Sequence, residues 1–158
     1  IGNFSPQKAK EFISNLSSVM ITGETLLLSF DMVKPKNILE HAYNDNKDIT
    51  AQFNLNILNV ANKHAKTNFN SLDFEHLAFY NRINSRIEMH LKAKKNLEIN
   101  SPYLDKRINI RKGETIHTEN SYKFTHKTIQ NLARAGQLEI KNIFTDKHKW
   151  FSVAQLCK

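Results

Sequence analysis

An amphipathic helical pattern followed directly by a continuous apolar run is the feature that most constrains the fold of this chain. Ser5-Pro6 precedes apolar residues at helical spacing that continue to Met20, and the apolar run at 24–31 begins just after Gly23. A serine before a proline is typical of a helix start. A short apolar run without alternation predicts a strand buried on both faces of a parallel sheet. A helix followed by a buried strand predicts an α/β layer.

The pattern changes after Val33 and predicts a separate unit in the middle of the chain. Residues 37–43 predict a short helix, and Asp48 is expected to cap a longer one. The expected apolar stripe of that longer helix is Ile49, Phe53, Leu55, Ile57, Leu58 and Ala61. A further helical turn is expected at 73–75. Alternation then favours strands over 77–99, with a turn at 81–84, and again at 107–111. This section predicts an antiparallel sheet with helices packed on it.

The C-terminal part returns to a helix and two strands. A polar run over 113–124 is expected to be ordered and extended. Thr125 predicts the start of a helix over 126–135, and Gly136 is expected to end it in a left-handed conformation. Strands at 138–144 and 150–156 read as a hairpin joined through 145–147. The two ends of the chain therefore predict α/β structure around an inserted unit.

Composition narrows the class of protein and its partners. The single Cys157 excludes an intramolecular disulfide and a multi-cysteine zinc site, so a reducing, cytoplasmic location is expected. No apolar run is long enough to cross a bilayer, which predicts a soluble protein. Lys and Arg number 23 against 15 Asp and Glu, a net charge of +8. The basic clusters at 92–95 and 106–112 lack interleaved aromatic residues, which favours a solvated basic face over a nucleic-acid site.

Several common catalytic and cofactor motifs are absent from the residues given. His64, His76, His90 and His117 have carboxylates nearby, but no two of them show the helical spacing of three or four that directs both rings at one ion, so no metal site is predicted. No Gly-x-Ser-x-Gly sequence surrounds a serine. The four glycines, at 2, 23, 113 and 136, are isolated, so no Gly-rich cradle for a cofactor is complete here.

The polar run contains one pair suited to a specific ligand. Glu119 and Ser121 lie two residues apart, so both side chains project to one face of an extended segment. A carboxylate and a hydroxyl side by side can each hold one nitrogen of an imidazole, the hydroxyl either donating or accepting. The alternative for this pair is an edge strand whose polar side chains are solvated. Met89 lies on an otherwise apolar face, so filling the core is the simpler interpretation of that residue.

These segments together match a known family. The residues that carry the match are Ile1–Phe4, Ala42–Asp45, Ile49–Asn56, Arg86–Met89, Gly113–Ile116, Thr118–Phe124, and Thr145-Asp146 before Trp150–Ser152. They occur in order over nearly the whole chain, which thereby resembles the histidine-specific, S-adenosylmethionine-dependent methyltransferases.

The resemblance implies a fold and a division into domains. It implies the C-terminal part of a Rossmann-like class I methyltransferase, with an α+β substrate-binding domain inserted into an α/β domain. Residues 1–33 and 124–158 are then expected in the methyltransferase domain and 34–123 in the inserted domain, with the amino acid between the two. Family members carry a Gly-rich cofactor motif that these residues lack. We expect it upstream of Ile1, and we predict that these 158 residues alone are inactive or very weakly active.

The resemblance also implies substrate-binding residues. Asn3 and Tyr43 are expected to bind the substrate α-carboxylate, Glu119 and Ser121 to hold the imidazole nitrogens, and Met89 to shape the side-chain pocket. The implied cofactor is S-adenosylmethionine and the implied substrate is L-histidine, and no residue is assigned as a general base.

Two alternatives and one association are kept open. Besides methylation of histidine, the alternatives are a relative acting on another amino acid, such as a tryptophan derivative, and a non-catalytic amino-acid-binding module. Glu119 and Met89 argue against the first of these. Apolar surface left exposed in these residues is expected to favour dimerisation.

Overall fold

The computed structural model describes residues 1–158 and divides into two compact units. Unit 1 is Ile1–Pro35, Asn81–Arg86 and Asn120–Lys158, and unit 2 is Lys36–Tyr80 and Ile87–Glu119. The division expected from sequence placed 34–35, 81–86 and 120–123 in the inserted domain, whereas packing groups these residues with unit 1. None of the helices combines the length and apolar character needed to cross a membrane.

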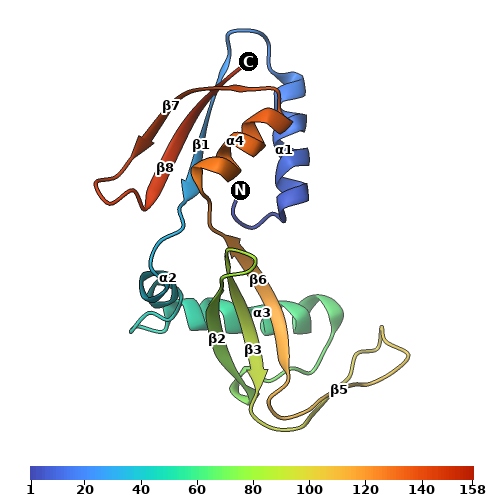
Figure 1. The fold of residues 1–158 in the computed structure, drawn as a ribbon. Helices are drawn as coiled ribbons and strands as arrows, with labels where there is room; N and C mark the ends of the chain where they lie inside the picture. The colour runs from blue at the N-terminus through green and yellow to red at the C-terminus, as the bar shows by residue number, and fades with distance from the viewer. The chain divides into compact units, whose positions relative to one another are not determined.

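Unit 1 is a three-stranded sheet with two helices (Figure 1). Its elements are α1 (Pro6–Val19), β1 (Thr25–Asp31), α4 (His126–Ala135), β7 (Glu139–Thr145) and β8 (Phe151–Cys157). The strand order is β1-β8-β7, and β8 in the middle is antiparallel to both neighbours. The last strand of the chain therefore runs against β1 and β7, which are parallel to each other.

Strand β1 is confirmed in its position but not in its predicted environment. Leu26, Leu28 and Phe30 point toward the core, whereas Leu27 on the opposite face is 63% exposed. The prediction of a strand buried on both faces of a parallel sheet is therefore wrong for this chain. The reason is that β1 pairs antiparallel with β8, and the helices of unit 1 supply apolar side chains to one face of the sheet.

The core of unit 1 confirms the two helices predicted at its ends. The Ser5 side chain accepts from the backbone N–H of Lys8, and Thr125 caps α4 reciprocally with Thr128. Both helices then bury one apolar stripe against the sheet. The buried residues of this core are Ala9, Ile13, Phe30, Met32, Phe124, Ile129, Leu132, Ala133, Leu138, Ala154 and Leu156.

The end of α4 corrects the prediction for Gly136. Its φ is −89°, which is not left-handed, and the positive φ of 53° belongs to the next residue, Gln137. Glycine is required here by space instead. A Cβ at Gly136 would lie 2.8 Å from Ile13 Cγ2, in the contact between α4 and α1.

The β7–β8 hairpin is confirmed, and one carboxylate organises its turn. Asp146 accepts hydrogen bonds from the backbone N–H groups of His148, Trp150 and Phe151 at 2.7–2.8 Å. Hydrogen bonds to the ionised form, the one from Phe151 foremost, hold the pKa of Asp146 below its ordinary value.

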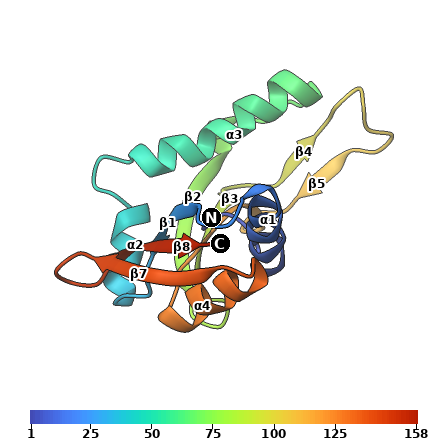
Figure 2. The same cartoon turned by 90° about the horizontal axis from the view of Figure 1, so that it is seen from above.

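Unit 2 contains a second three-stranded sheet, a two-stranded ribbon and two α-helices (Figure 2). Its elements are α2 (Lys36–Tyr43), α3 (Ile49–Ala65), the 3₁₀ turn η1 (Ser71–Asp73), β2 (Phe74–Asn81), β3 (Arg86–Ala93), β4 (Leu97–Ile99), β5 (Ile108–Ile110) and β6 (Thr115–Tyr122). The last residue of β2, the first of β3 and the last three of β6 are grouped with unit 1. The sheet order is β2-β3-β6, and β4 pairs antiparallel with β5. A helical turn was predicted at 73–75, but η1 ends at Asp73, and Phe74 and Glu75 belong to β2. The prediction is therefore correct only for Asp73.

The start of α3 corrects the prediction for Asp48. Its backbone lies in the left-handed region at φ 55°, and its side chain makes no capping hydrogen bond. The cap is Asp45, whose carboxylate accepts from Thr50 N at 2.9 Å and from Ile49 N at 3.0 Å. These bonds, the one from Thr50 first, lower the pKa of Asp45 to about 2. A capping residue is expected directly before the apolar periodic segment, whereas Asp45 lies four residues before the first residue of α3. The sequence pattern therefore did not indicate Asp45 as the cap.

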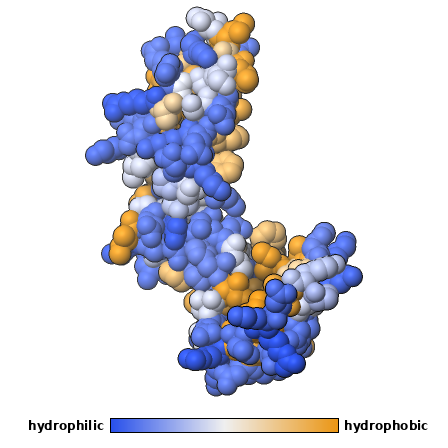
Figure 3. Space-filling view, turned by 90° about the vertical axis from the view of Figure 1, so that its right-hand side faces the viewer, coloured by the Kyte–Doolittle hydropathy of each residue, from blue (hydrophilic) through white to orange (hydrophobic).

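The apolar stripe predicted for α3 is only partly buried. Leu58 is in the core and Leu55 packs against it, but Ile49, Phe53 and Ile57 are exposed. The buried face of α3 carries Asn54, which is 3% exposed. Hydrophobic residues accordingly gather on the surface in the lower part of Figure 3.

Two apolar clusters hold unit 2 together. The first joins α3 to the sheet and the ribbon through Leu58, Phe74, Leu91, Ala93, Ile99 and Ile110. The second joins α2 to the sheet through Leu39, Ala78, Ile87 and Met89. The predicted common face of Ile87, Met89 and Leu91 is thus confirmed, and it fixes β3 between its neighbours.

Candidate functional site

The five residues predicted to bind substrate divide between the units. Tyr43, Met89 and Glu119 belong to unit 2, and Asn3 and Ser121 belong to unit 1.

Tyr43 and Met89 meet in the second apolar cluster of unit 2. Tyr43 is the last residue of α2 and packs, half-buried, against that cluster. Met89 is one of its members and is 3% exposed, so its side chain fills the core as the simpler interpretation of the sequence expected. Any influence of Met89 on a ligand is therefore exerted from beneath the surface.

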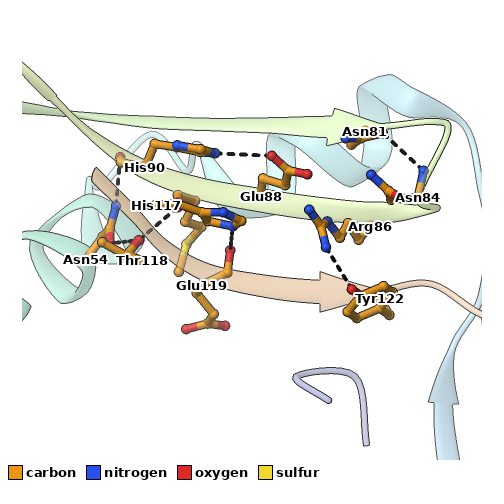
Figure 4. Close-up of polar contacts among 11 residues, drawn as sticks. Asn54, Asn81, Asn84, Arg86, Glu88, His90, His117, Thr118, Glu119 and Tyr122 are labelled. Atoms are coloured by element: carbon orange, nitrogen blue, oxygen red, sulfur yellow. Dashed lines mark hydrogen bonds and ion pairs between the residues drawn. The ribbon is translucent and has the colours of Figure 1, made fainter. Parts of the chain in front are cut away.

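Glu119 lies beside a cavity of about 180 Å³ between β6 and α3. The cavity is lined by Phe53, Asn54, Asn56, Ile57, Val60, Thr118 and Glu119. The apolar wall of this cavity is formed by exposed side chains of α3, namely Phe53, Ile57 and Val60. In Figure 4 the Glu119 carboxylate extends away from the strand that carries Glu88 and His90. A carboxylate at the edge of an apolar wall can accept a hydrogen bond from a flat ring that bears an N–H.

A histidine pair lies across two strands of the same sheet (Figure 4). The rings of His90 on β3 and His117 on β6 stack with centroids 4.4 Å apart, and His90 Nε2 lies 3.2 Å from Glu88 Oε2. One ligand atom from each of these three residues lies within 4.8 Å of the others. Two imidazoles and a carboxylate are donors that zinc and similar ions accept.

In this structure the His90 and His117 rings are stacked, and His90 is hydrogen-bonded to Glu88. His90 and His117 meet across neighbouring strands, an arrangement that spacing along a single helix does not indicate.

In unit 1, the turn that contains Asn3 is fixed against β6. Asn3 is exposed, and the carbonyl of the preceding Gly2 accepts from Tyr122 N at 2.8 Å. A Cβ at Gly2 would lie 3.7 Å from Ser121 Oγ. The structure therefore brings the backbone beside Asn3 close to Ser121.

Ser121 is held by a buried lysine. Lys123 Nζ donates to Ser121 Oγ at 2.8 Å and pairs with Asp31 Oδ2 at 2.8 Å, and its side chain is fully buried. Asp31 also pairs with Lys34 at 2.5 Å. Because the ammonium donates to Oγ, this contact occupies one of the two acceptor positions of the Ser121 hydroxyl. A donor role for Ser121, an alternative that the sequence left open, is compatible with this contact.

A larger cavity, about 290 Å³, lies elsewhere in unit 1. It is lined by residues of α1, α4, the turn 83–85 and the end of β6, and none of the five predicted residues lines it. The volume of a cavity alone therefore does not point to the predicted site.

Four polar residues next to the predicted ones were not assigned to the substrate site from sequence. Asn54 and His76 are buried or partly buried hydrogen-bonding groups of unit 2, Thr118 bonds Asn54 at 2.6 Å, and Lys123 holds Ser121. An asparagine among apolar residues at helical spacing, and a lysine beside Phe124, were the available signals. Buried polar groups of this kind need partners, and the partners come from distant segments.

Comparisons with known proteins point to one family. The model of the family described as "Histidine-specific methyltransferase, SAM-dependent" matches residues 1–158. Two curated relatives are named histidine N-alpha-methyltransferase. The one from Mycolicibacterium smegmatis is 38% identical over 137 residues, covering 86% of this chain and 43% of the relative. The one from Mycobacterium tuberculosis is 37% identical over 142 residues, covering 89% of this chain and 44% of the relative.

More distant matches extend the comparison. Ergothioneine biosynthesis protein 1 of Schizosaccharomyces pombe is 26% identical over 142 residues, covering 89% of this chain and 18% of that protein. A solved S-adenosylmethionine-dependent methyltransferase from Clostridium acetobutylicum aligns with a TM-score of 0.44 at 9% identity, covering 96% of this chain and 51% of that one. This chain thus spans less than half of the length of the two bacterial relatives. Because the family model matches every residue, the chain belongs to the histidine-specific, S-adenosylmethionine-dependent methyltransferase family.

Proposed function

We propose that this chain is the substrate-recognising part of an enzyme that transfers a methyl group from S-adenosylmethionine to the α-amine of L-histidine. The observation that carries the proposal is the match of the histidine-specific family model over all 158 residues. The two bacterial relatives, at 38% and 37% identity, bear the name of this activity.

In this proposal the imidazole is recognised by complementary groups on β6. The Glu119 carboxylate accepts from the ring N–H, and the Ser121 hydroxyl donates to the other ring nitrogen. The contact from Lys123 to Ser121 Oγ supports the direction of the second bond. A neutral imidazole has one N–H and one lone pair, so this pair of groups matches it and disfavours rings without both.

The remaining predicted residues complete the substrate site. Asn3 and Tyr43 bind the α-carboxylate, and Met89 limits the side-chain pocket from below. We propose the same residues for these roles as the resemblance implies, with 34–123 serving as the substrate-binding domain. Their task is orientation, because methyl transfer requires the neutral amine in line with the methyl group, and orientation supplies several kcal/mol of the barrier reduction.

The residues of this chain do not form a complete cofactor site. S-adenosylmethionine supplies an electrophilic methyl group on a positively charged sulfur. The four isolated glycines offer no Gly-rich turn for such a ligand, and we assign none of these residues to it. No general base is assigned either.

The experiment is mass spectrometry of a reaction containing S-adenosylmethionine, a mixture of the common amino acids, and the protein encoded by the complete natural reading frame around these residues. Methylated histidine alone is the expected product. A folded protein that methylates a tryptophan derivative instead would replace the substrate, and one that methylates no amino acid would favour a non-catalytic binding module. The isolated 158-residue chain serves as the control and is expected to be inactive or very weakly active.

A further inference from the structure

We propose that Asn54, His76 and Thr118 are positioning residues that hold the substrate-binding residues of unit 2 in place. They form a hydrogen-bonded chain from Tyr43 to Met89, called here the Asn54 network: Tyr43, His76, Asn54, Thr118 and Met89. The inference rests on the proposed function, because the roles of Tyr43, Met89 and Glu119 belong to it.

The centre of the network is an asparagine whose two amide protons and carbonyl oxygen are all hydrogen-bonded. Asn54 is buried on the inner face of α3. Its Nδ2 donates to His76 Nδ1 and to the backbone carbonyl of His90, each at 3.0 Å. Its Oδ1 accepts from Thr118 Oγ1 at 2.6 Å (Figure 4). Both amide protons and the carbonyl oxygen are therefore engaged, which fixes the orientation of the amide.

The first branch of the network reaches Tyr43. His76 Nε2 lies 2.9 Å from the backbone carbonyl of Tyr43. A carbonyl only accepts, so Nε2 carries a proton, and Nδ1 of the neutral ring accepts from Asn54. The chain of bonds sets the tautomer of His76 and anchors the C-terminal end of α2.

A second bond anchors the same end of α2 independently. The residue after Tyr43, Asn44, donates from Nδ2 to Ala78 O on β2 at 3.2 Å and to Glu40 O at 2.8 Å. The end of α2 is thus tied to β2 on both sides of the Tyr43 peptide, which fixes where the Tyr43 side chain begins.

The second branch of the network reaches Met89 and Glu119. Thr118 Oγ1 lies 2.9 Å from the backbone carbonyl of Met89 and 2.6 Å from Asn54 Oδ1, and its single hydroxyl proton is shared between these two acceptors. Thr118 directly precedes Glu119, and Asn54, Thr118 and Glu119 line the same cavity. The buried Asn54 amide is therefore linked to the backbone of Tyr43 through His76 and to that of Met89 through Thr118. Thr118 is in turn the neighbour of Glu119.

The chemistry explains why such a network suits recognition of a small amino acid. Tyr43, Met89 and Glu119 come from α2, β3 and β6, which are separate in sequence. A small shift of one element against the others misaligns the substrate, and misplacement by about 1 Å can cost about a hundredfold in rate. Hydrogen bonds between the elements have preferred distances and angles, so they resist such shifts.

The kinetic test uses the complete protein with matched variants on two elements. Asn54→Ala is compared with Asn59→Ala, an exposed asparagine of α3 that bonds only Asn56 among the side chains around it. Thr118→Val, which lacks the hydroxyl, is compared with Thr118→Ser, which keeps it. We expect Asn54→Ala and Thr118→Val to raise the histidine KM about tenfold or more, with the KM for S-adenosylmethionine unchanged and the two controls near wild type.

A spectroscopic test does not depend on activity. In NMR spectra of the wild-type protein we expect a slowly exchanging Nε2–H proton of His76, assigned by its loss in His76→Gln. The signal should exchange rapidly in folded Asn54→Ala. Rapid exchange in the wild type, or protection that survives Asn54→Ala, would show that Asn54 does not hold His76.

The outcomes separate this inference from the proposed function. If the wild type is active and the Asn54→Ala and Thr118→Val variants keep the histidine KM, the positioning role is wrong. It is also wrong if these variants lose activity and thermal stability together without a change in KM. Both outcomes leave the proposed function intact. A wild type that methylates no amino acid contradicts the proposed function and the positioning role that rests on it.

Discussion

At the scale of single residues, the polar groups that matter most in this chain are those whose partners come from distant segments. Lys123 is fully buried, yet it lies between Asp31 on β1 and Ser121 on β6. Asn54 lies on a helix face that is otherwise apolar. In each case several hydrogen bonds offset the free-energy cost of removing the polar group from water.

Replacing the carboxylate of Glu119 tests the proposed preference for histidine. Glu119→Gln keeps the size of the side chain but loses the charge that accepts from the imidazole N–H. A charge-assisted hydrogen bond contributes about 1.5–3 kcal/mol, so kcat/KM for histidine should fall about tenfold to a hundredfold. Steady-state kinetics with the complete protein measures this, with Glu114→Gln at an exposed position as the control. An unchanged kcat/KM would remove Glu119 from the site.

Replacing the buried lysine tests the direction of the Ser121 hydrogen bond. Lys123→Met removes the donor to Ser121 and one partner of Asp31, so the free energy of unfolding should fall by about 1–3 kcal/mol. The histidine KM should rise, because the hydroxyl proton is no longer directed toward the ligand. Lys34→Met is the matched control, since Lys34 also pairs with Asp31. Equal KM values for the two variants would show that only the charge on Asp31 matters.

At the scale of elements, helices begin and end through contacts that local patterns only partly indicate. Ser5 and Thr125 cap the helices that they precede, as predicted. Asp48 does not, because the chain turns there in the left-handed region and Asp45 reaches the free N–H groups of α3 instead. The strength of a helix start therefore depends on the turn before it.

The cap of α3 predicts a specific pH dependence. The pKa of Asp45 is lowered from 3.8 to about 2 in the folded protein, so its ionised carboxylate stabilises the folded state above pH 3.8. This contribution is lost as the pH falls through about 2. Asp45→Ala should lower the denaturant midpoint at neutral pH, and its difference from wild type should shrink as the pH falls from 3.8 toward 2.

Denaturant unfolding monitored by circular dichroism across this pH range makes the measurement. The matched variant is Asp48→Ala, which should have little effect because the Asp48 side chain makes no capping bond. A larger loss of stability in Asp48→Ala than in Asp45→Ala would contradict the assignment of the cap.

Gly136 predicts a packing defect where α4 meets α1. In Gly136→Ala the new Cβ meets Ile13 Cγ2 at 2.8 Å and Ile13 O at 3.3 Å, so one helix must shift. Overpacking of this kind costs about 1–3 kcal/mol. Thermal unfolding of the variant should show a lower Tm than the wild type. A Tm at or above the wild-type value would show that the helices separate without cost.

At the scale of the whole molecule, unit 1 presents a sheet face that its own helices do not cover. Leu27 on β1, Phe144 on β7 and Phe151 on β8 are exposed by 63%, 57% and 47%. Strand β1 also pairs on one side only within this chain. Apolar side chains beside an unpaired strand edge favour association with another polypeptide.

We therefore predict that the isolated 158-residue chain self-associates through this face. Light scattering after size-exclusion chromatography should show a mass that rises with protein concentration. The double variant Leu27→Lys/Phe144→Lys should be monomeric, whereas Ile83→Lys, at a position 95% exposed on a turn, should not change the mass. A monomeric wild type over the same concentrations would contradict the prediction.

Much of the fold was predictable because it depends on local order. Helical spacing with a capping residue predicted α1 and α4, alternation predicted β3, and turn residues predicted the β7–β8 hairpin. The motifs that resemble the family predicted the family to which the chain belongs, because they are specific combinations of residues and not general periodicity.

Other features were decided only by tertiary structure, since they depend on which segments meet. The antiparallel pairing of β1 with β8 left Leu27 exposed, although its neighbours in sequence are equally apolar. The exposed face of α3 and the stacking of His90 on His117 likewise arise from contacts across many residues. Sequence by itself determined the elements, the family and the types of residue available for binding. The partners of the buried Asn54 and Lys123 could come only from the folded chain, because hydrogen bonds between distant segments leave no periodic trace in the sequence.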